Sequence, residues 1–424
     1  MRYIADFHIH SKYSRATSKE MDLEHIGEWA KIKGIQIVGT GDFTHPEWLE
    51  QIKNKLEPAE TGLFKLRDSS NPTRFILTSE ISCIYSKNNR VRKIHNVFFA
   101  PNIEAVEKFN AHIGWTGGNL KSDGRPILGM DAKELVKIAL NISKDFFIVP
   151  AHIWTPWFSL FGSKSGFDAL EECFEEYSDN IFALETGLSS DPQMNWMISS
   201  LDKYTFISNS DAHSPAKLGR EANVFEGSEI DYFKIIEAIK SGGKENNLSL
   251  KMIATIEFFP EEGKYHYDGH RICDVCLEPK ETKKLNGVCP KCGRPLTVGV
   301  LFRVEQLADR EQGFKPKNSL PFYNLVPLEE VVADSLNLTT VSQKVKNEYD
   351  NLIKNFDNEF NVLLDVSEQN LVDKTDPKIA KGIINVRQGK VRKEPGYDGV
   401  FGKIRVFSNG NGEKKTQKKQ ESLF

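Results

Sequence analysis

Histidine and carboxylate residues recur near the ends of short apolar segments in the first half of the chain, and these residue types can bind metal ions. The segments have strand length and are rich in β-branched or aromatic residues, with amphipathic stretches or insertions between them. They read DFHIH (6–10), IVGTGDFTH (37–45), FILTSE (75–80), IHNVFFA (94–100), FFIVPAH (146–152), IFALETG (181–187) and FISNSDAH (206–213). This alternation predicts an α/β fold of parallel strands joined by crossover helices. Strands that close into a barrel bring their C-terminal ends to one face, so the sequence predicts a multinuclear metal site.

Nine residues of these segments are candidate metal ligands. His8 and His10 are two positions apart on a predicted strand, so both imidazoles face the same side. Glu80 ends an apolar run where a free carboxylate would be costly, unless it bound a metal or formed a salt bridge. The others are Asp42, His45, His95, His152, Asp211 and His213. Singly, each could be a hydrogen-bonded core histidine or a capping aspartate. Together, histidines and carboxylates without cysteine are typical of hydrolytic Zn, Mn or Fe sites, in which Glu80 could bridge two ions.

Four cysteines have the spacing of a structural zinc site. Cys273 and Cys276 form one C-x-x-C pair, and Cys289 and Cys292 form the second after twelve intervening residues. This spacing predicts a closed tetrahedral zinc site with four thiolate ligands. Such a small module would obtain most of its folding free energy from the metal. Basic residues around it, among them Arg271, could contact a phosphate backbone or simply form a solvated face.

The patterns divide the 424 residues into three regions and a tail. They are a barrel over 1–250, a zinc module over 262–305, a mainly helical region over 306–407 and a basic tail over 408–424. Helices are expected within the barrel at 21–34, 131–143 and 231–243, and in the C-terminal region at 327–337 and 342–366. The tail, SNGNGEKKTQKKQESLF, has too few apolar residues to fold alone and is predicted to be disordered.

Composition excludes some classes of protein. No run of about 18 apolar residues occurs, so no transmembrane helix and no membrane partner are expected. The chain begins MRYIADFHIH, which enters a predicted strand at once and argues against a signal peptide. Four of the six cysteines lie in C-x-x-C pairs, which suits metal binding in a reducing compartment. We therefore expect a cytoplasmic location.

The order of the candidate ligands along the chain (HxH, Asp/His, Glu, His, His, DxH) resembles the polymerase-and-histidinol-phosphatase (PHP) family over about residues 1–225. Members of that family fold as a seven-stranded β/α barrel and bind up to three metal ions for phosphoester hydrolysis. The resemblance implies two to three divalent ions, Zn, Mn, Mg or Fe. Their ligands would be His8, His10, Glu80 and Asp211 for the first, Glu80, His95 and His152 for the second, and His213 with His45 or Asp42 for the third. The chain departs from the family where TGDFTH replaces Thr-Asp-His, which leaves Asp42 and His45 as alternatives, and where SKYSRAT lacks an aspartate.

A second resemblance, to the endonuclease Q family, extends over about residues 1–407. It is carried by GDFTHPEW, PAHIWTPWFSLFGSKSGF, ETGLSSDP, KYHYDGHRICDVC, CGRPL, RVEQLADR and PGYDGVFG. Members of this family nick DNA on the 5′ side of deaminated bases (hypoxanthine, uracil, xanthine) and at abasic sites. The resemblance implies a metal-dependent DNA repair endonuclease. The residue chemistry alone indicates a metal-dependent phosphodiesterase with a zinc module. A PHP phosphatase for small phosphomonoesters and a non-catalytic, metal-stabilised DNA-binding scaffold remain alternatives.

Further residues could act on a DNA substrate with the catalytic set of His8, His10, Glu80 and Asp211. Asp191, near the end of the sixth predicted strand, could be catalytic or could form a turn. The aromatic residues after His152 could stack on an extruded base or pack beneath a loop; they are Trp154, Trp157, Phe158 and Phe161. Loop residues at the same rim could contact phosphates; they are Arg15, Lys121, Arg125 and Lys164.

The end of the tail resembles the sliding-clamp-binding motif, in which a glutamine anchors in one pocket and an apolar or aromatic plug fills another. Gln417 or Gln420 would be the anchor, upstream of Leu423 and Phe424. Gln420 occupies the central aliphatic position in the first register, and the chain stops before the aromatic pair in the second. The sliding clamp is therefore a possible partner, and a solvated tail without function is the alternative.

Overall fold

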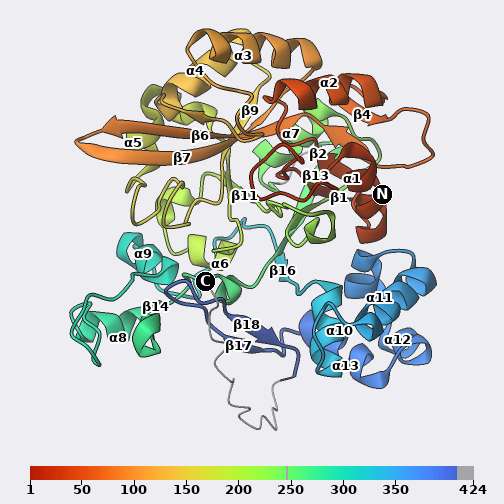
Figure 1. Ribbon diagram of the computed structural model, residues 1–424, viewed down its shortest axis with the longest axis vertical. Helices are drawn as coiled ribbons and strands as arrows, with labels where there is room; N and C mark the ends of the chain where they lie inside the picture. The colour runs from red at the N-terminus through yellow and green to blue at the C-terminus, as the bar shows by residue number, and fades with distance from the viewer. Residues whose placement is uncertain (245–246, 408–424) are drawn as a thin grey trace, which may run out of the picture.

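The computed structural model describes residues 1–244 and 247–407, and its upper part contains two principal β-sheets (Figure 1). The larger sheet is mixed and contains, in spatial order, β16 (Phe322–Asn324), β13 (Leu250–Glu257), β12 (Ala222–Gly227), β1 (Arg2–Asp6), β2 (Ile37–Gly39), β5 (Arg74–Ile76), β4 (Leu63–Leu66) and β3 (Leu56–Pro58). The second contains β8 (Ile127–Leu128), β6 (Thr78–Lys87), β7 (Arg90–Phe99) and β9 (Phe147–Pro150). A parallel pair, β10 (Ala183–Glu185) and β11 (Thr205–Ile207), completes this part.

The predicted α/β class is confirmed, but the prediction of parallel strands throughout is wrong. β1, β2 and β5 are parallel neighbours, as the pattern indicates. β6 and β7 instead form a long antiparallel hairpin that projects from the molecule, and β7 is also antiparallel to β9 (Figure 1). The hairpin turns at Asn88 and Asn89, both with positive φ, and two residues cannot contain a crossover helix.

Side chains, rather than a backbone ladder, join the end of β1 to the end of β11. The Phe7 N–H donates to Asn209 Oδ1 at 2.9 Å, and the Ser210 N–H donates to Asp6 Oδ1 at 3.0 Å. One backbone bond follows, from the His10 N–H to the Ala212 carbonyl at 3.0 Å. Residues 8–10 and 211–213, which are 200 positions apart in sequence, therefore lie side by side.

Helices cover the outer faces of these sheets. They are α1 (Leu23–Lys33), α2 (Pro46–Lys55), α3 (Ile103–Trp115), α4 (Ala132–Ile142), α5 (Leu170–Phe174), α6 (Pro192–Asn195) and α7 (Tyr232–Ser241). The helices predicted within 21–34, 131–143 and 231–243 are confirmed as α1, α4 and α7. Aspartates cap all three N-termini, and Gly34 ends α1 with φ of 86°, a conformation that glycine adopts at little cost.

The lower part of the molecule contains two groups of C-terminal elements (Figure 1). The first group comprises β14 (Asp268–His270), β15 (Val275–Leu277), α8 (Pro279–Lys284) and α9 (Val300–Leu307). The second comprises α10 (Leu328–Leu336), α11 (Gln343–Phe356), α12 (Glu368–Lys374) and α13 (Pro377–Arg387), and the hairpin β17 (Arg392–Glu394) and β18 (Lys403–Arg405) lies between the two groups. The helix predicted over 342–366 is confirmed for Gln343–Phe356 but is not continuous: Asp357 follows α11 with φ of 70°, and a separate helical turn covers Asn361–Asp365.

The division of the chain into domains stays a prediction. No helix within residues 1–244 and 247–407 has the length and apolar character needed to cross a membrane. The predicted disordered tail over 408–424, with the clamp-motif residues Gln417, Gln420, Leu423 and Phe424, lies outside the described residues.

Candidate metal centre and its cavity

Two groups of side chains that could each hold a metal ion share Glu80. The first group is His8, His10, Glu80 and Asp211, and the second is Glu80, His95 and His152. The His10 Nε2 lies 3.2 Å from Glu80 Oε2 and 3.0 Å from Asp211 Oδ1. The other oxygen, Glu80 Oε1, lies 2.6 Å from His95 Nδ1 and 2.9 Å from His152 Nε2. The two oxygens of one carboxylate therefore face different ligand groups.

Strand pairing explains why Glu80 meets His95. Glu80 lies opposite Val97 in the antiparallel β6–β7 pair, and His95 is two residues from Val97. Side chains alternate between faces along a strand, so Glu80 and His95 are diagonal neighbours on one face. His95 is thus in the middle of a strand, and its predicted place at a strand's C-terminal end is wrong.

Two further carboxylates hold the rings of His8 and His10. Both oxygens of Glu185 lie 3.0 Å from His8 Nδ1, and Glu185 also accepts hydrogen bonds from the His152 backbone N–H and the Asn209 side chain. Asp42 Oδ1 lies 3.0 Å from His10 Nδ1. Each ring therefore turns its Nε2 toward the first ligand group, an arrangement typical of metal-binding histidines.

The chemistry of this donor set fits divalent metal ions. The Nε2 atoms of His8 and His10 and Oδ1 of Asp211 are buried, and none has a partner with hydrogen-bond geometry among the described residues. Burial lowers the pKa of His95 to about 4, so its ring is neutral at pH 7, the form that binds a metal. Burial also opposes the ionisation of Glu80, but the neighbouring His95, Arg125 and His8 outweigh it and hold the pKa of Glu80 well below its usual range.

Backbone strain is concentrated at this centre. His152, Asp211 and Asp42 have φ of 30°, 48° and 48°, which is uncommon for residues with a side chain. Gly187 packs against His152 so closely that a Cβ on it would lie 2.4 Å from the His152 Cβ. Strained residues persist where the surrounding structure requires them, and they cluster at functional sites.

The predicted third ion stays a prediction, and its candidate ligands are dispersed in this structure. Asp42 accepts hydrogen bonds from the Ser11 backbone and from the Ser11 and Ser14 hydroxyls, besides holding His10. His45 stacks on Tyr13 at 4.4 Å and belongs to neither ligand group. His213 lies beside His10, with ring centroids 4.6 Å apart. Within residues 1–244 and 247–407, no third ligand group forms around Asp42, His45 and His213.

A cavity of about 620 Å³ opens beside the metal ligands. His95, His152, Glu185 and Asp211 contribute to its lining, and so do the cations Arg15, Arg125 and Lys264. The Arg125 Nη1 donates to Glu80 Oε2 at 3.1 Å. Arg15 forms an ion pair with Asp123. The cavity therefore joins the ligand groups to positive charge, which suits a phosphate-bearing substrate.

The aromatic residues after His152 have two different environments. Trp154 and Phe161 are buried against one another at 5.0 Å, and the Trp154 Nε1 donates to Asn195. The prediction that these two contact DNA is therefore wrong, because core packing occupies both rings. Trp157 and Phe158 line the cavity, and Trp157 is 40% exposed.

Other predicted site residues lie outside the lining of the cavity. Asp191 caps α6 by accepting a hydrogen bond from the Met194 N–H, so its predicted catalytic role is not supported. Burial raises the pKa of Asp191 to about 6. Lys121 and Lys164 on loops, and Arg271 at the start of a short 3-10 helix, are exposed and do not line the cavity.

Three residues of the site, Glu185, Tyr265 and Phe401, were missed in the sequence. Glu185 ends the strand IFALE, the same signal that identified Glu80, and it could have been found there. The cavity wall also includes Tyr265 and Phe401 from the C-terminal half of the chain. No local pattern indicates that these distant residues approach the metal ligands.

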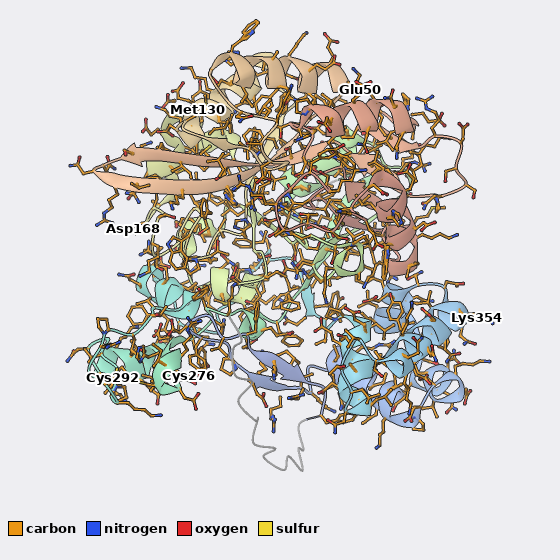
Figure 2. All side chains as sticks on the ribbon, viewed as in Figure 1. Glu50, Met130, Asp168, Cys276, Cys292 and Lys354 are labelled. Carbon is orange, nitrogen blue, oxygen red and sulfur yellow. The ribbon has the colours of Figure 1, made fainter. Side chains whose placement is uncertain are left out.

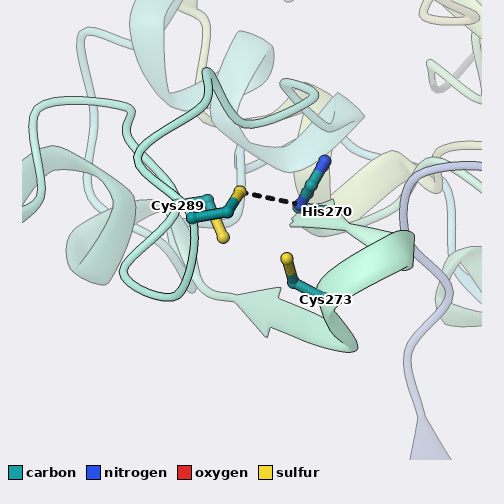
Figure 3. A group of neighbouring side chains, drawn as sticks. His270, Cys273 and Cys289 are labelled. Carbon is teal, nitrogen blue, oxygen red and sulfur yellow. Dashed lines mark hydrogen bonds between the residues drawn. The ribbon is translucent and has the colours of Figure 1, made fainter.

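The predicted four-cysteine site is corrected in one ligand. His270, Cys273, Cys289 and Cys292 form a compact group, and Cys276 is not part of it. Figure 3 shows Cys273 and Cys289 turned toward His270, and Cys276 lies in the same module at the lower left of Figure 2. Val275 packs with Cys289 in a small core. Side chains alternate along β15, so Cys276 points away, whereas His270, paired with Val275, is on the inner face.

Single substitutions should distinguish the four-cysteine site from the site formed by His270, Cys273, Cys289 and Cys292. We expect Cys276→Ser to retain the bound zinc, and His270→Ala or Cys273→Ser to lose it and lower the melting temperature, because the metal supplies folding free energy to so small a module. Zinc content by mass spectrometry and thermal melting would measure both. Equal loss of zinc in the Cys276 and Cys273 variants would restore the four-cysteine site.

The sequence has relatives along different lengths of the chain. Residues 327–390 match the family model described as the MJ0043 C-terminal domain. The uncharacterized protein MJ0043 of Methanocaldococcus jannaschii is 34% identical over 310 residues, which are 70% of this chain but only 38% of that protein. The uncharacterized protein YqxK of Bacillus subtilis is 30% identical over 419 residues, which cover 95% of this chain and 98% of that one.

Two solved structures match almost the whole chain. One is the lesion-specific endonuclease PfuEndoQ from Pyrococcus furiosus, with a TM-score of 0.84 and 33% identity over 97% of this chain and 98% of that one. The other is an endonuclease Q in complex with a 27-mer duplex that has an abasic lesion at the active site. It has a TM-score of 0.82 and 33% identity over 97% of this chain and 99% of that one. By its fold and its sequence over nearly its full length, the protein belongs to the endonuclease Q family of metal-dependent nucleases.

Proposed function

We propose that this protein is a DNA repair endonuclease that hydrolyses the phosphodiester on the 5′ side of a damaged nucleotide, with deaminated bases and abasic sites as its substrates. The observation that carries the proposal is the shared Glu80, which joins two ligand groups beside a cavity that Arg15, Arg125 and Lys264 help to line. Family membership supports it, as does the abasic duplex in the active site of a related enzyme.

The catalytic group in this proposal consists of His8, His10, Glu80 and Asp211, with His95 and His152 completing the second ligand group. Divalent ions bound there would acidify a water molecule and neutralise charge on a phosphodiester. Glu185 and Asp42 orient the His8 and His10 rings, which keeps the Nε2 atoms in place. Such orienting carboxylates normally contribute about 10–100-fold to metal affinity or activity.

Arg125 connects the ligand groups to the substrate. Its Nη1 donates to Glu80, and the rest of its planar guanidinium offers further donors at the cavity. The negative charge of Glu80 raises the pKa of the Arg125 guanidinium above its usual value and outweighs burial, which lowers it. Arg125 therefore stays charged and can bind a non-bridging phosphate oxygen beside the ligand groups.

The size and lining of the cavity suit a damaged nucleotide extruded from the duplex. A deaminated base is mispaired, so unstacking it costs less than unstacking a normal base. Trp157 and Phe158 offer aromatic surface to such a base, and Arg15 and Lys264 offer charge to the backbone. Lys121, Lys164 and Arg271 are exposed and are proposed to contact more distant phosphates. The zinc module, the domain boundaries and the sliding clamp as a partner also stay proposals.

A nicking assay tests this function. End-labelled duplexes with one deoxyinosine, one deoxyuridine, one abasic site or no lesion would be incubated with Mg, Mn or Zn, and the product ends mapped. We expect nicks 5′ to each lesion and none in the undamaged duplex. Hydrolysis of p-nitrophenyl phosphate without nicking would indicate a phosphatase. Binding of the duplexes without nicking, at every metal tested, would indicate a scaffold.

A further inference from the structure

Phe401 is an exposed aromatic residue at the cavity, contributed by a segment almost 250 positions from His152 in sequence. It lies in the loop of residues 395–402 between β17 and β18, and its side chain is 68% exposed. Phe401 lines the same cavity as His152, Asp211 and Trp157. Phe401 is not an isolated exposed ring, because Trp157, Phe158 and Tyr265 line the same cavity, and contiguous apolar surface marks binding sites.

Backbone contacts hold this loop rigidly against the segment that precedes the zinc module. The Gly396 N–H donates to the Glu261 carbonyl at 2.7 Å, and the Gly402 N–H donates to the Glu262 carbonyl at 3.0 Å. A Cβ on Gly402 would lie 2.0 Å from the Glu261 carbonyl oxygen, so only glycine permits this approach. Between these two contacts, Tyr397 and Val400 exchange backbone hydrogen bonds at 3.0 and 2.8 Å. The loop therefore presents Phe401 from a fixed position.

Side chains fasten the same loop to the module that contains the cysteines. Asp398 accepts hydrogen bonds from the Arg271 N–H at 2.7 Å and from the Thr297 hydroxyl at 2.6 Å. The Tyr397 hydroxyl donates to Asp274 at 2.7 Å. The loop has partners on the module, whereas the Phe401 ring is left exposed.

Two aromatic surfaces of the cavity are supported by neighbours from one short segment. The Lys264 ammonium lies 5.3 Å from the centre of the Phe401 ring. Tyr265 meets Trp157 edge to face, with ring centroids 5.9 Å apart. Aromatic rings held in place in a cavity that Arg15, Arg125 and Lys264 also line form a stacking surface for nucleic acid bases, which all have a π face.

We propose that Phe401 is a specificity-determining residue that stacks on the damaged base when it enters the cavity. This inference rests on the proposed function, because it names the part of the substrate that this wall of the cavity recognises. Phe401 would contribute to binding of a nucleotide that retains its base, such as deoxyuridine or deoxyinosine. It would contribute little to an abasic nucleotide, which has no base to stack.

Kinetics of the Phe401→Ala variant with two substrates test the proposal. We expect kcat/KM for a deoxyuridine duplex to fall about tenfold or more, and kcat/KM for a matched abasic duplex to stay within about threefold. Phe401→Tyr should restore the deoxyuridine rate, because tyrosine keeps the ring. Val400→Ala is the matched control, since Val400 is 40% exposed in the same loop and does not line the cavity. Thermal melting would show whether every variant is folded.

Each outcome has a defined meaning. Equal losses with both duplexes in a folded Phe401→Ala variant, or unchanged rates with both, would overturn the role of Phe401 and leave the proposed function intact. If the unaltered protein nicks neither duplex, the proposed function itself fails. A loss in Phe401→Ala that Val400→Ala reproduces would assign the effect to the loop rather than to the ring.

Discussion

Replacing Glu80 by glutamine should reduce the nicking rate by more than ~100-fold, a larger loss than orienting residues around a metal usually cause. Glu80 belongs to both ligand groups and is buried among four histidines and Arg125. Glutamine keeps the shape of the side chain but removes the negative charge that offsets two bound cations. We therefore expect both the rate and the bound divalent metal to fall.

The measurement pairs nicking of a lesion duplex with metal content by mass spectrometry. Glu104→Gln is the control, because Glu104 is exposed and its ion pair with Lys108 joins neighbouring turns of α3. This control should leave both quantities unchanged. A folded Glu80→Gln variant with normal metal content and normal rate would remove the shared carboxylate from the mechanism.

Asp42→Asn should lower activity about 10–100-fold, whereas His45→Asn should change it little. Asp42 accepts the hydrogen bond of the His10 ring at 3.0 Å and fixes which nitrogen faces the ligand group. Asparagine can rotate to offer an oxygen but no longer offers a negative charge to the ring. His45 contacts Tyr13 and is in neither ligand group, so losing its imidazole removes no metal donor.

Rates of nicking at several metal concentrations would separate the two variants. Weaker metal binding in Asp42→Asn should appear as a higher metal concentration for half-maximal rate. The opposite ranking, with His45→Asn the more damaged of two folded variants, would make His45 the ligand and restore a third ion.

The donors of the two ligand groups could be predicted from sequence because each lies on or beside a strand. A strand end fixes where the next residues begin, so His8, His10, His152 and Asp211 converge because β1, β9 and β11, although in three different sheets, end close to one another. Glu80 could be predicted for an energetic reason, since a carboxylate ending a buried strand needs a partner. Side chains alternate along a strand, which explains why His95 lies on the same face as Glu80, although β7 runs antiparallel to β6 and not parallel as predicted.

Only the tertiary structure decided the remaining features, because they depend on contacts between segments far apart in sequence. Spacing alone could not show that His270, rather than Cys276, lies with Cys273, Cys289 and Cys292, since this depends on which face of β15 packs against Cys289. It could not show that Asp42 holds the His10 ring. Phe401 lines the cavity because glycines let the loop of residues 395–402 dock against residues 261–263. Such docking leaves no periodic signal in the sequence. The residue types and their strand positions determined the ligand chemistry, and packing between distant segments determined the shape of the site.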